Sequence, residues 1–358
     1  MTIKIGIVGV GNCASNLIQG LFYYKNVKSK DIIPGLMHPV LGNYKISDIK
    51  VISAFDVDSR KVGKDISEAI MQEPNNTVKI INIPKLNVPV FKGHIFDGIG
   101  EYMKEVIKTD KMKPVNIAKE LQDSGTEILI NFLPVGSEKA TRFYAKEALK
   151  AECAFLNGMP AFIASDNKWS KKFERAKLPI IGDDSKSQVG ATILHRVLTK
   201  LCMNRGAVID KTYQLNFGGN SDFLNMLERK RLKSKKISKT ESVQSQMIKR
   251  LHDEKIHIGP SDFVPWLKSR KIAYIRIEGR LFGDVPFNIE TRLDVEDKAN
   301  SSGVVVDSIR CLKIALDREI GGPLISASAY FCKHPPVQMS DDEARRKLEM
   351  FIEGKIER

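Results

Sequence analysis

The chain lacks several features that would place it in a membrane or outside the cell. No stretch reaches the ~18 consecutive apolar residues of a membrane-spanning helix. The 5 cysteines are widely scattered, with neither a CxxC pair nor the spacing of a zinc site. That pattern favours a reducing cytoplasm over a disulfide framework. The apolar N-terminus has no basic leader, so we interpret it as a buried strand and helix. We therefore expect a cytoplasmic protein with no membrane partner.

Acidic residues are the scarcer charged class, with 43 Asp and Glu against 57 Lys and Arg and a net charge of +14. Six of the basic residues fall in KRLKSKKISK, at 230–239, which first suggests nucleic acid. The run has no interleaved aromatic side chains on which bases could stack, and Glu228 and Glu241 flank it. We expect no nucleic-acid partner, which leaves a solvated surface or a site for a small anion.

The length of 358 residues exceeds the usual size of one compact core and predicts two domains. Short apolar runs that end in turn-forming or polar residues alternate with helical patterns. The apolar runs lie at 3–11, 51–58, 127–134, 153–160 and 178–184, and helical patterns lie notably at 12–24, 137–150 and 186–203. This alternation predicts an α/β fold with a Rossmann-like, doubly wound parallel sheet.

The pattern changes after about residue 205. Polar and apolar residues alternate in YIRIEGRLF and FNIETRLDVED, on either side of a Gly283-Asp284 turn, which predicts a half-exposed antiparallel hairpin. Helical patterns at 302–317 and 341–354 follow. We expect a first domain at 1–200, completed by 300–358, and a second, smaller α+β domain at 201–299.

A glycine turn follows the first predicted strand. GVGNCA places Gly9, Gly11 and Ala14 in the G-x-G-x-x-A form of the dinucleotide-binding fingerprint, with Asn12 and Cys13 between them. The first glycine permits the tight turn, the second admits a pyrophosphate, and the small third residue lets the helix pack on the strand. The turn predicts a dinucleotide site; the alternative is a glycine turn that holds no cofactor.

An acidic residue at the end of the second strand would hold the ribose hydroxyls, and it would favour NAD over NADP. Asp56 or Asp58, in AFDVD, fits this role, and we take Asp56 as the first candidate. Both lie about twice the usual ~20 residues from the glycines. The segment rich in Pro and Gly at 25–50 is therefore interpreted as an insertion.

Several longer motifs occur in order along the chain. They are GIVGVGNCASNLIQG, PGLMHPVLG, AFDVD, LPVGSEKA, GDDSKSQVGAT, NFGGNSDFLNM, SKKISK and IGPSDFVPWL. Together they resemble myo-inositol-1-phosphate synthase of the short archaeal and actinobacterial type, from the first strand to about residue 340. The resemblance implies NAD as cofactor, glucose 6-phosphate as substrate, and a homotetramer.

The resemblance also implies the reaction, which gives 1L-myo-inositol 1-phosphate (1D-myo-inositol 3-phosphate). In this family NAD+ oxidises C5 of the open-chain sugar, and the resulting ketone acidifies C6. The enolate then attacks the C1 aldehyde, and the same NADH reduces the ketone again. Such a site must bind a phosphate dianion and stabilise oxyanions, for which cationic side chains are suited.

Four lysines match active-site lysines of the family. The resemblance assigns Lys235 and Lys333 to the C5 oxygen, and Lys239 and Lys271 mainly to the phosphate. Crowding lowers the pKa of neighbouring lysines, so one of them could act as a general acid or base. Lys235 and Lys239 would share one face of a helix through their i, i+4 spacing. The other cations of the run are interpreted as solvated: Lys230, Arg231, Lys233 and Lys236.

The remaining counterparts are polar residues and one further glycine. Asp184 and Asp297 match carboxylates near the reacting hydroxyls and the lysines, and Asp184 is also placed at the cofactor. The others are Ser187 for the phosphate, Asn216, Asn220 and Asp222 for the polar wall of the pocket, and Gly136 and Ser137 for a turn that contacts the cofactor.

The resemblance leaves the ion requirement open, because some members use a divalent cation and others depend on monovalent ions. No ligand cluster is evident by spacing, although Asp184 and Asp297 could contribute oxygen atoms to a hard cation. A second hypothesis is an NAD(P) oxidoreductase with net redox turnover. It predicts that absorbance at 340 nm accumulates, whereas a synthase forms product with catalytic NAD+.

Overall fold

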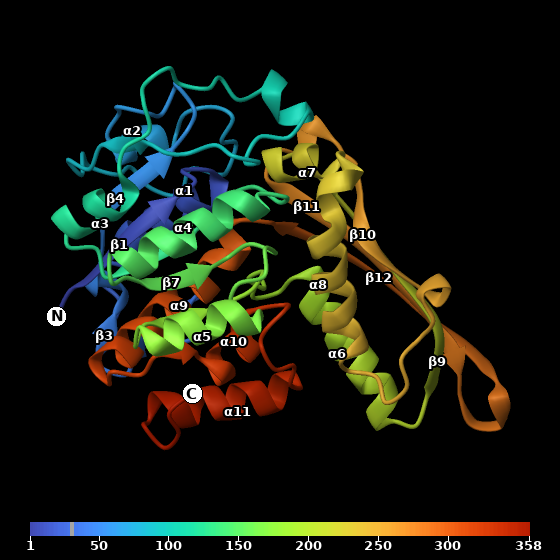
Figure 1. Cartoon of the computed structure of the whole chain (residues 1–358). Coiled ribbons are helices and arrows are strands. Elements are labelled where there is room, and N and C mark those ends of the chain that lie inside the picture. Colours follow the sequence, from blue (N-terminus) through green and yellow to red (C-terminus); the bar gives the residue numbers. More distant parts are fainter. Residues whose placement is uncertain (29–31) are drawn as a thin grey trace.

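Two sheets of different construction divide the chain (Figure 1). The computed structural model describes residues 1–28 and 32–358. A seven-stranded sheet has the order β13-β8-β7-β6-β1-β4-β5, and a four-stranded sheet has the order β10-β9-β11-β12. No helix within the described residues is both long and apolar enough to cross a membrane.

The seven-stranded sheet is parallel throughout. Its strands are β1 (Ile3–Val8), β4 (Ile49–Asp56), β5 (Val90–Lys92), β6 (Ile128–Asn131), β7 (Ala154–Asn157), β8 (Pro179–Ile181) and β13 (Gly322–Pro323). Every residue of β6 and β7 is buried, as is usual for parallel strands with both faces covered. The strand order reverses at β1, which places the carboxyl ends of β1 and β6 at the switch point where such folds bind ligands.

Helices cover both faces of this sheet. They are α1 (Asn12–Tyr23), α2 (Ile66–Ala69), α3 (Ile117–Asp123), α4 (Glu138–Lys150), α5 (Asn167–Arg175), α9 (Ala299–Asp317), α10 (Ile325–Phe331) and α11 (Asp341–Ile352). Ile128 and Ile130 of β6 join an apolar cluster with α1 and α9, while Leu129, between them, joins a cluster with α3 and α4 on the opposite face. This alternation confirms the predicted doubly wound fold.

The segment between α1 and β4 carries a small two-stranded addition. It contains β2 (Val40–Leu41), β3 (Tyr44–Lys45) and the 3₁₀ helix η1 (Ile46–Asp48). Leu41 and Tyr44 are buried in the same core cluster as α9. Residues 29–31 of the predicted insertion lie outside the described residues.

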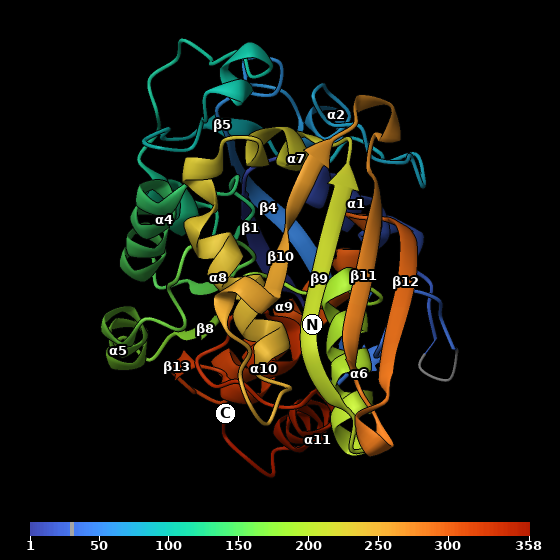
Figure 2. The same cartoon turned by 90° about the vertical axis from the view of Figure 1, so that its right-hand side faces the viewer.

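The four-stranded sheet contains β9 (Val208–Gly218), β10 (Ile256–Phe263), β11 (Arg270–Arg280) and β12 (Pro286–Glu296). The predicted hairpin is confirmed, since Arg280 pairs with Pro286 and the turn uses Gly283 at a φ of 71°. The outer face of this sheet is turned toward the viewer in Figure 2.

Helices α6 (Ala191–Asn204), α7 (Ser221–Met226) and α8 (Lys233–Gln244) accompany the four-stranded sheet, and α6 packs on β9 and β11. Short 3₁₀ helices complete the chain: η2 (Tyr102–Glu105), η3 (Arg229–Leu232), η4 (Asp253–Lys255), η5 (Pro265–Leu267) and η6 (Phe282–Asp284). The packing of α6 groups it with the second sheet, although the helix begins before residue 200. The domain boundaries stay a prediction.

Candidate active site

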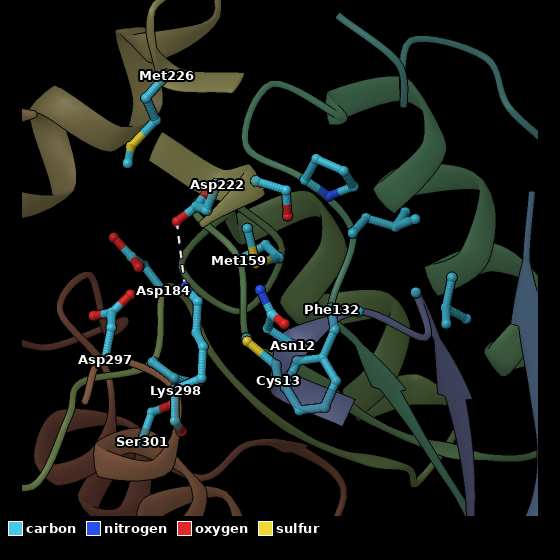
Figure 3. A pocket seen from close by; sticks show the side chains of 18 of the residues that line it. Asn12, Cys13, Phe132, Met159, Asp184, Asp222, Met226, Asp297, Lys298 and Ser301 are labelled. Carbon is cyan, nitrogen blue, oxygen red and sulfur yellow. Dashed lines mark hydrogen bonds and ion pairs between the residues drawn. The ribbon is translucent and has the colours of Figure 1, made fainter. Parts of the chain in front are cut away.

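A cavity of about 220 Å³ lies at the carboxyl edge of the seven-stranded sheet and reaches the elements of the four-stranded sheet. Residues that follow β1, β4, β6, β7 and β8 form one part of its wall. Residues from α7, α8, β11 and the start of α9 form the other part. Figure 3 shows Asn12 and Cys13 on the first side, with Asp222, Asp297 and Lys298 opposite.

The glycine turn has the geometry of a dinucleotide cradle. Gly9 has a φ of +90°, and a Cβ atom there would lie 2.7 Å from the carbonyl oxygen of Phe132, so glycine is required. A Cβ atom at Gly11 would meet nothing within 4 Å, and Gly11 lines the cavity with Asn12 and Cys13. No side chain caps the N-terminus of α1, which leaves its first N–H groups available to an anion. These residues fit the pyrophosphate of NAD.

Ala14 and the two acidic candidates take different positions. Ala14 is fully buried in the core under α1, which is the packing role of the third small residue. Asp56 lines the cavity, and its carboxylate accepts hydrogen bonds from the backbone N–H groups of Val10 (2.7 Å) and Val57 (2.6 Å). Asp58 is buried and paired with Arg60 at 2.5 Å. The geometry favours Asp56 for the ribose role.

Gly136 and Ser137, which directly precede α4, are not among the residues that line the cavity. The Arg231 side chain lies against Gly136, and its guanidinium donates to the carbonyl oxygens of Val135 (3.1 Å) and Asp97 (2.8 Å). Ser137 is buried, and its Oγ has no hydrogen-bond partner among the described residues. The interpretation of Arg231 as a solvated cation is wrong, because backbone carbonyl groups hold it in a half-buried position.

Helix α8 divides the lysine run. Lys235 and Lys239 are 8% and 4% exposed and line the cavity, whereas Lys233 and Lys236 on the other side of the helix are exposed. Lys230, in η3, is also exposed. The predicted i, i+4 pair is confirmed as one buried face of a helix.

Asp184 and Lys333 are joined although 149 residues separate them. Asp184 follows β8, and the backbone N–H of Lys333 donates to its carbonyl oxygen at 2.8 Å. The Lys333 Nζ then donates to Asp184 Oδ1 (2.8 Å) and to the Ser185 carbonyl oxygen (2.6 Å). Lys235 approaches the same Oδ1 at 3.8 Å, and Ser238 of α8 donates to Oδ2. Two lysines thus flank one buried carboxylate.

A second group of charges surrounds Asp297, just after β12. Its carboxylate lies 3.4 Å from the Nζ of Lys271 and 3.0 Å from that of Lys298. Asp222, in the first turn of α7, lies 3.5 Å from the Nζ of Lys298 and 4.0 Å from that of Lys235. The two groups are therefore continuous through Asp222. Besides Lys61 and Asp56 near the glycine turn, five lysines and three aspartates line this cavity.

Burial and mutual attraction set the pKa values of the carboxylates. Burial raises the pKa of Asp184, but Lys235 and Lys333 together outweigh this effect and hold the pKa well below its usual range. Burial likewise raises the pKa of Asp297, and Lys298 and Lys271 outweigh that effect. Both carboxylates are thus anionic at neutral pH.

The pKa values of the lysines shift in different directions. Burial lowers the pKa of Lys235, but the attraction of Asp184 and Asp222 leaves it above the usual value. Burial together with Lys271 and Lys235 holds the pKa of Lys239 well below that of a free lysine. The pKa of Lys333 is also lowered, first by burial. Lys239 is therefore the amine best suited to exchange a proton near neutral pH.

The other predicted polar residues are placed as follows. Ser187 lines the cavity. Asn216 lies buried in β9 and donates to the carbonyl oxygen of Gly259 at 2.6 Å. Asn220 caps α7 by accepting from the N–H groups of Asp222 and Phe223, and it donates to Asp297 at 3.3 Å. Asn216 and Asn220 are not among the residues that line the cavity; Asn220 orients Asp297.

Lys298 is the main residue that the sequence reasoning missed. It lines the cavity and contacts both Asp222 and Asp297. Burial lowers its pKa, but these two carboxylates raise it well above the usual value. Its position directly after Asp297 in VEDKANS was the available signal.

The carboxylates do not fit a divalent cation. Asp184 and Asp297 belong to the two different charge groups, and each contacts a lysine ammonium at 3.0 Å or less. Within residues 1–28 and 32–358, no group of three or more His, Cys, Asp or Glu side chains could hold a metal ion. The proposed contribution of Asp184 and Asp297 to one hard cation is not supported by this geometry.

Comparisons with known proteins agree with these features. A family model of myo-inositol-1-phosphate synthase matches residues 190–298. Inositol-3-phosphate synthase from Mycolicibacterium smegmatis is 54% identical over 356 residues, with 98% of both chains covered. The one from Corynebacterium glutamicum is 50% identical over 356 residues, again covering 98% of both. A myo-inositol-1-phosphate synthase-related protein from Thermotoga maritima shares the fold, with a TM-score of 0.80, 23% identity and 99% of both chains covered. The chain therefore belongs to the inositol-3-phosphate synthase family, as its motifs predicted, and is an enzyme of that kind.

Proposed function

We propose that this enzyme converts D-glucose 6-phosphate to 1D-myo-inositol 3-phosphate with NAD held at the glycine turn. The observation that carries the proposal is one cavity that joins a dinucleotide cradle to a cluster of buried lysines. When bound, NAD would supply a hydride acceptor for C5 of the open-chain sugar and a donor for the same carbon later. The substrate and product are isomers, so the chain needs no external oxidant.

Lys235 and Lys333 are the proposed partners of the C5 oxygen. They flank Asp184 from two elements, and their ammonium groups can stabilise the negative charge that the oxygen gains as the enolate forms. Asp184 holds both cations in place and balances their repulsion when no substrate is bound. The hydroxyl proton lost at C5 returns there when the ketone is reduced.

Lys239, Lys271 and Ser187 are the proposed phosphate-binding group, and Lys239 also carries a proton. The lowered pKa of Lys239 favours a neutral amine. A phosphate dianion bound beside this amine favours its protonation. Lys239 can therefore accept the C6 proton as the enolate forms. The C6 carbon then bonds to C1, and the C1 oxygen takes up one proton, which balances the one lost from C6.

The experiment is to incubate the purified protein with glucose 6-phosphate and a small fraction of one equivalent of NAD+. We expect inositol phosphate, identified by NMR, to exceed the NAD+ many times over while absorbance at 340 nm stays flat. An oxidoreductase with net turnover would instead produce NADH in step with product. That result would contradict the proposal.

The homotetramer implied by the resemblance is also proposed here. Tyr213 of β9 and Tyr274 of β11 are 37% and 43% exposed, and the open face of their sheet is turned toward the viewer in Figure 2. Exposed aromatic side chains on an open sheet face are typical of subunit contacts. Light scattering coupled to gel filtration should give the mass of four chains, and a monomer mass would contradict this.

A further inference from the structure

Two carboxylates on the boundary between the glycine turn and the lysine cluster share one cation. The Lys298 Nζ lies 3.0 Å from Asp297 Oδ2 and 3.5 Å from Asp222 Oδ2. Figure 3 shows Lys298 between the two aspartates, on the side of the cavity that faces Cys13. The two carboxylates come from the first turn of α7 and the end of β12, so the contact joins separate elements.

The position of Lys298 is set by its surroundings. It is the residue before the first turn of α9, and its carbonyl oxygen accepts hydrogen bonds from the hydroxyl groups of Ser301 (2.9 Å) and Ser302 (3.2 Å). Asp297 is fixed in turn, because its N–H donates to the carbonyl oxygen of Ser269 at 3.0 Å. The Lys298 side chain is 13% exposed. The ammonium is therefore a built part of the site.

Paired carboxylates around a shared position are the ligands that a hard divalent cation prefers. Here an oxygen atom of each carboxylate already contacts the ammonium of Lys298. A divalent ion at the same place would also be repelled by Lys235, whose Nζ lies 4.0 Å from Asp222. We propose that the Lys298 ammonium takes the place of a divalent cation in this site, so that the enzyme works without one.

The location of the Lys298 ammonium in the cavity indicates its role. Lys298 lines the same cavity as Asn12 and Cys13 of the glycine turn, where a dinucleotide would bring its negative pyrophosphate. The Asp222 Oδ1 is buried without a hydrogen-bond partner among the described residues, and it stays available to a donor on a ligand. Lys298 is thus a positioning residue that orients Asp222 and Asp297 and adds positive charge beside the cofactor.

The first test uses the unaltered enzyme, treated with EDTA and desalted. Titration with Mn²⁺, followed by EPR and calorimetry, should show no stoichiometric site. EDTA should change kcat/KM for glucose 6-phosphate by less than about twofold. One Mn²⁺ bound per chain, together with activity that EDTA abolishes and Mn²⁺ restores, would overturn the inference.

The second test removes the ammonium. Lys298→Ser leaves two carboxylates and a hydroxyl oxygen around the vacated space, so it should gain one Mn²⁺ site per chain. Its metal-free kcat/KM should fall by ~100-fold and recover in part when Mn²⁺ is added. Lys236→Ser, which removes the same charge from the exposed face of α8, should gain no site. The added change Asp222→Asn should abolish the gained site.

Absence of Mn²⁺ binding in a folded Lys298→Ser enzyme would contradict the inference. Thermal unfolding establishes whether that variant folds, and the titration of the unaltered enzyme decides if it does not. The activity measurements rest on the proposed function, but the Mn²⁺ titrations do not. A chain that forms no inositol phosphate under any condition would contradict the proposed function and leave the titrations readable.

Discussion

The two ends of the cavity are built in different ways. At the cofactor end, Gly9 and Gly11 follow β1, and Asp56 is the last residue of the adjacent strand β4. The backbone forms most of this end, through a positive φ and N–H groups that no side chain caps. At the lysine end, charged side chains arrive from α8, β11, the start of α9 and the segment after α10. The backbone cradle depends on the conformation of a short segment, whereas the charge cluster depends on contacts between segments that are far apart in the sequence. The two ends should therefore respond differently to substitution.

The largest expected effect separates chemistry from cofactor binding. Lys235→Ala should lower kcat by ~1000-fold, since it removes a cation that stabilises the developing oxyanion. The affinity for NAD+ should change little, because the ion pairs of Lys235 are with Asp184 and Asp222 of the lysine cluster. Steady-state kinetics and calorimetry check both. Lys236→Ala, one residue along on the exposed face, is the matched control and should behave like the unaltered enzyme; equal loss in both variants would refute the role of Lys235.

The converse change is at the glycine turn. Gly9→Ala would place a Cβ atom 2.7 Å from the Phe132 carbonyl oxygen at a φ of +90°, a strain of roughly 1–3 kcal/mol. We expect NAD+ affinity to fall by ~30-fold or more and the unfolding temperature to decrease. Binding of inorganic phosphate at the lysine end, measured by calorimetry, should persist. Unchanged NAD+ binding would show that the turn is not the cofactor cradle.

Replacing Asp56 or Asp58 should have smaller effects, which differ between the two residues. Asp56→Ala should weaken NAD+ binding by ~10-fold, because the carboxylate that faces the cavity would hold the ribose hydroxyls. Asp58→Ala should instead lower stability, since it leaves Arg60 without its buried partner. Calorimetry with NAD+ and thermal unfolding distinguish the two. A loss of NAD+ affinity in Asp58→Ala alone would transfer the ribose role to Asp58.

The smallest expected effect is in the pH profile. The pKa of Lys239 lies well below that of a free lysine, so its amine gains a proton as the pH falls through that lowered value. If the neutral amine accepts the C6 proton, kcat/KM should decrease on the acid side. The residual activity of Lys239→Met should lack this decrease, whereas Lys236→Met should keep it. An unchanged acid limb in Lys239→Met would contradict the role of Lys239 as proton acceptor.

The cofactor end could be predicted from the sequence because its residues are near one another along the chain. Buried parallel strands are continuous apolar runs, and the glycines follow the first of them, so the pattern carries both fold and turn. The strands β5 and β13, with 3 and 2 residues, are too short to produce such a pattern. The insertion before Asp56 was deduced from the unusual spacing alone.

The lysine end could be predicted only in part. Lys235 and Lys236 are the same residue type, and the helical phase of α8 alone separates them. The contact of Asp184 with Lys333 depends on backbone hydrogen bonds between segments 149 residues apart. In the sequence Arg231 cannot be distinguished from its exposed neighbours, because only the folded chain brings the carbonyl oxygens of Val135 and Asp97 to its guanidinium. Residue type and spacing do not predict such contacts between segments that are distant in the sequence.

The fate of the hydride taken from C5 shows whether both ends of the cavity act on one substrate molecule in one turnover. Glucose 6-phosphate deuterated at C5 would be incubated with catalytic NAD+ and an added pool of unlabelled NADH, and the product analysed by mass spectrometry and NMR. We expect inositol phosphate that keeps its deuterium at that carbon, because the hydride returns before the cofactor leaves. Product in which deuterium is replaced by hydrogen from the NADH pool would contradict it.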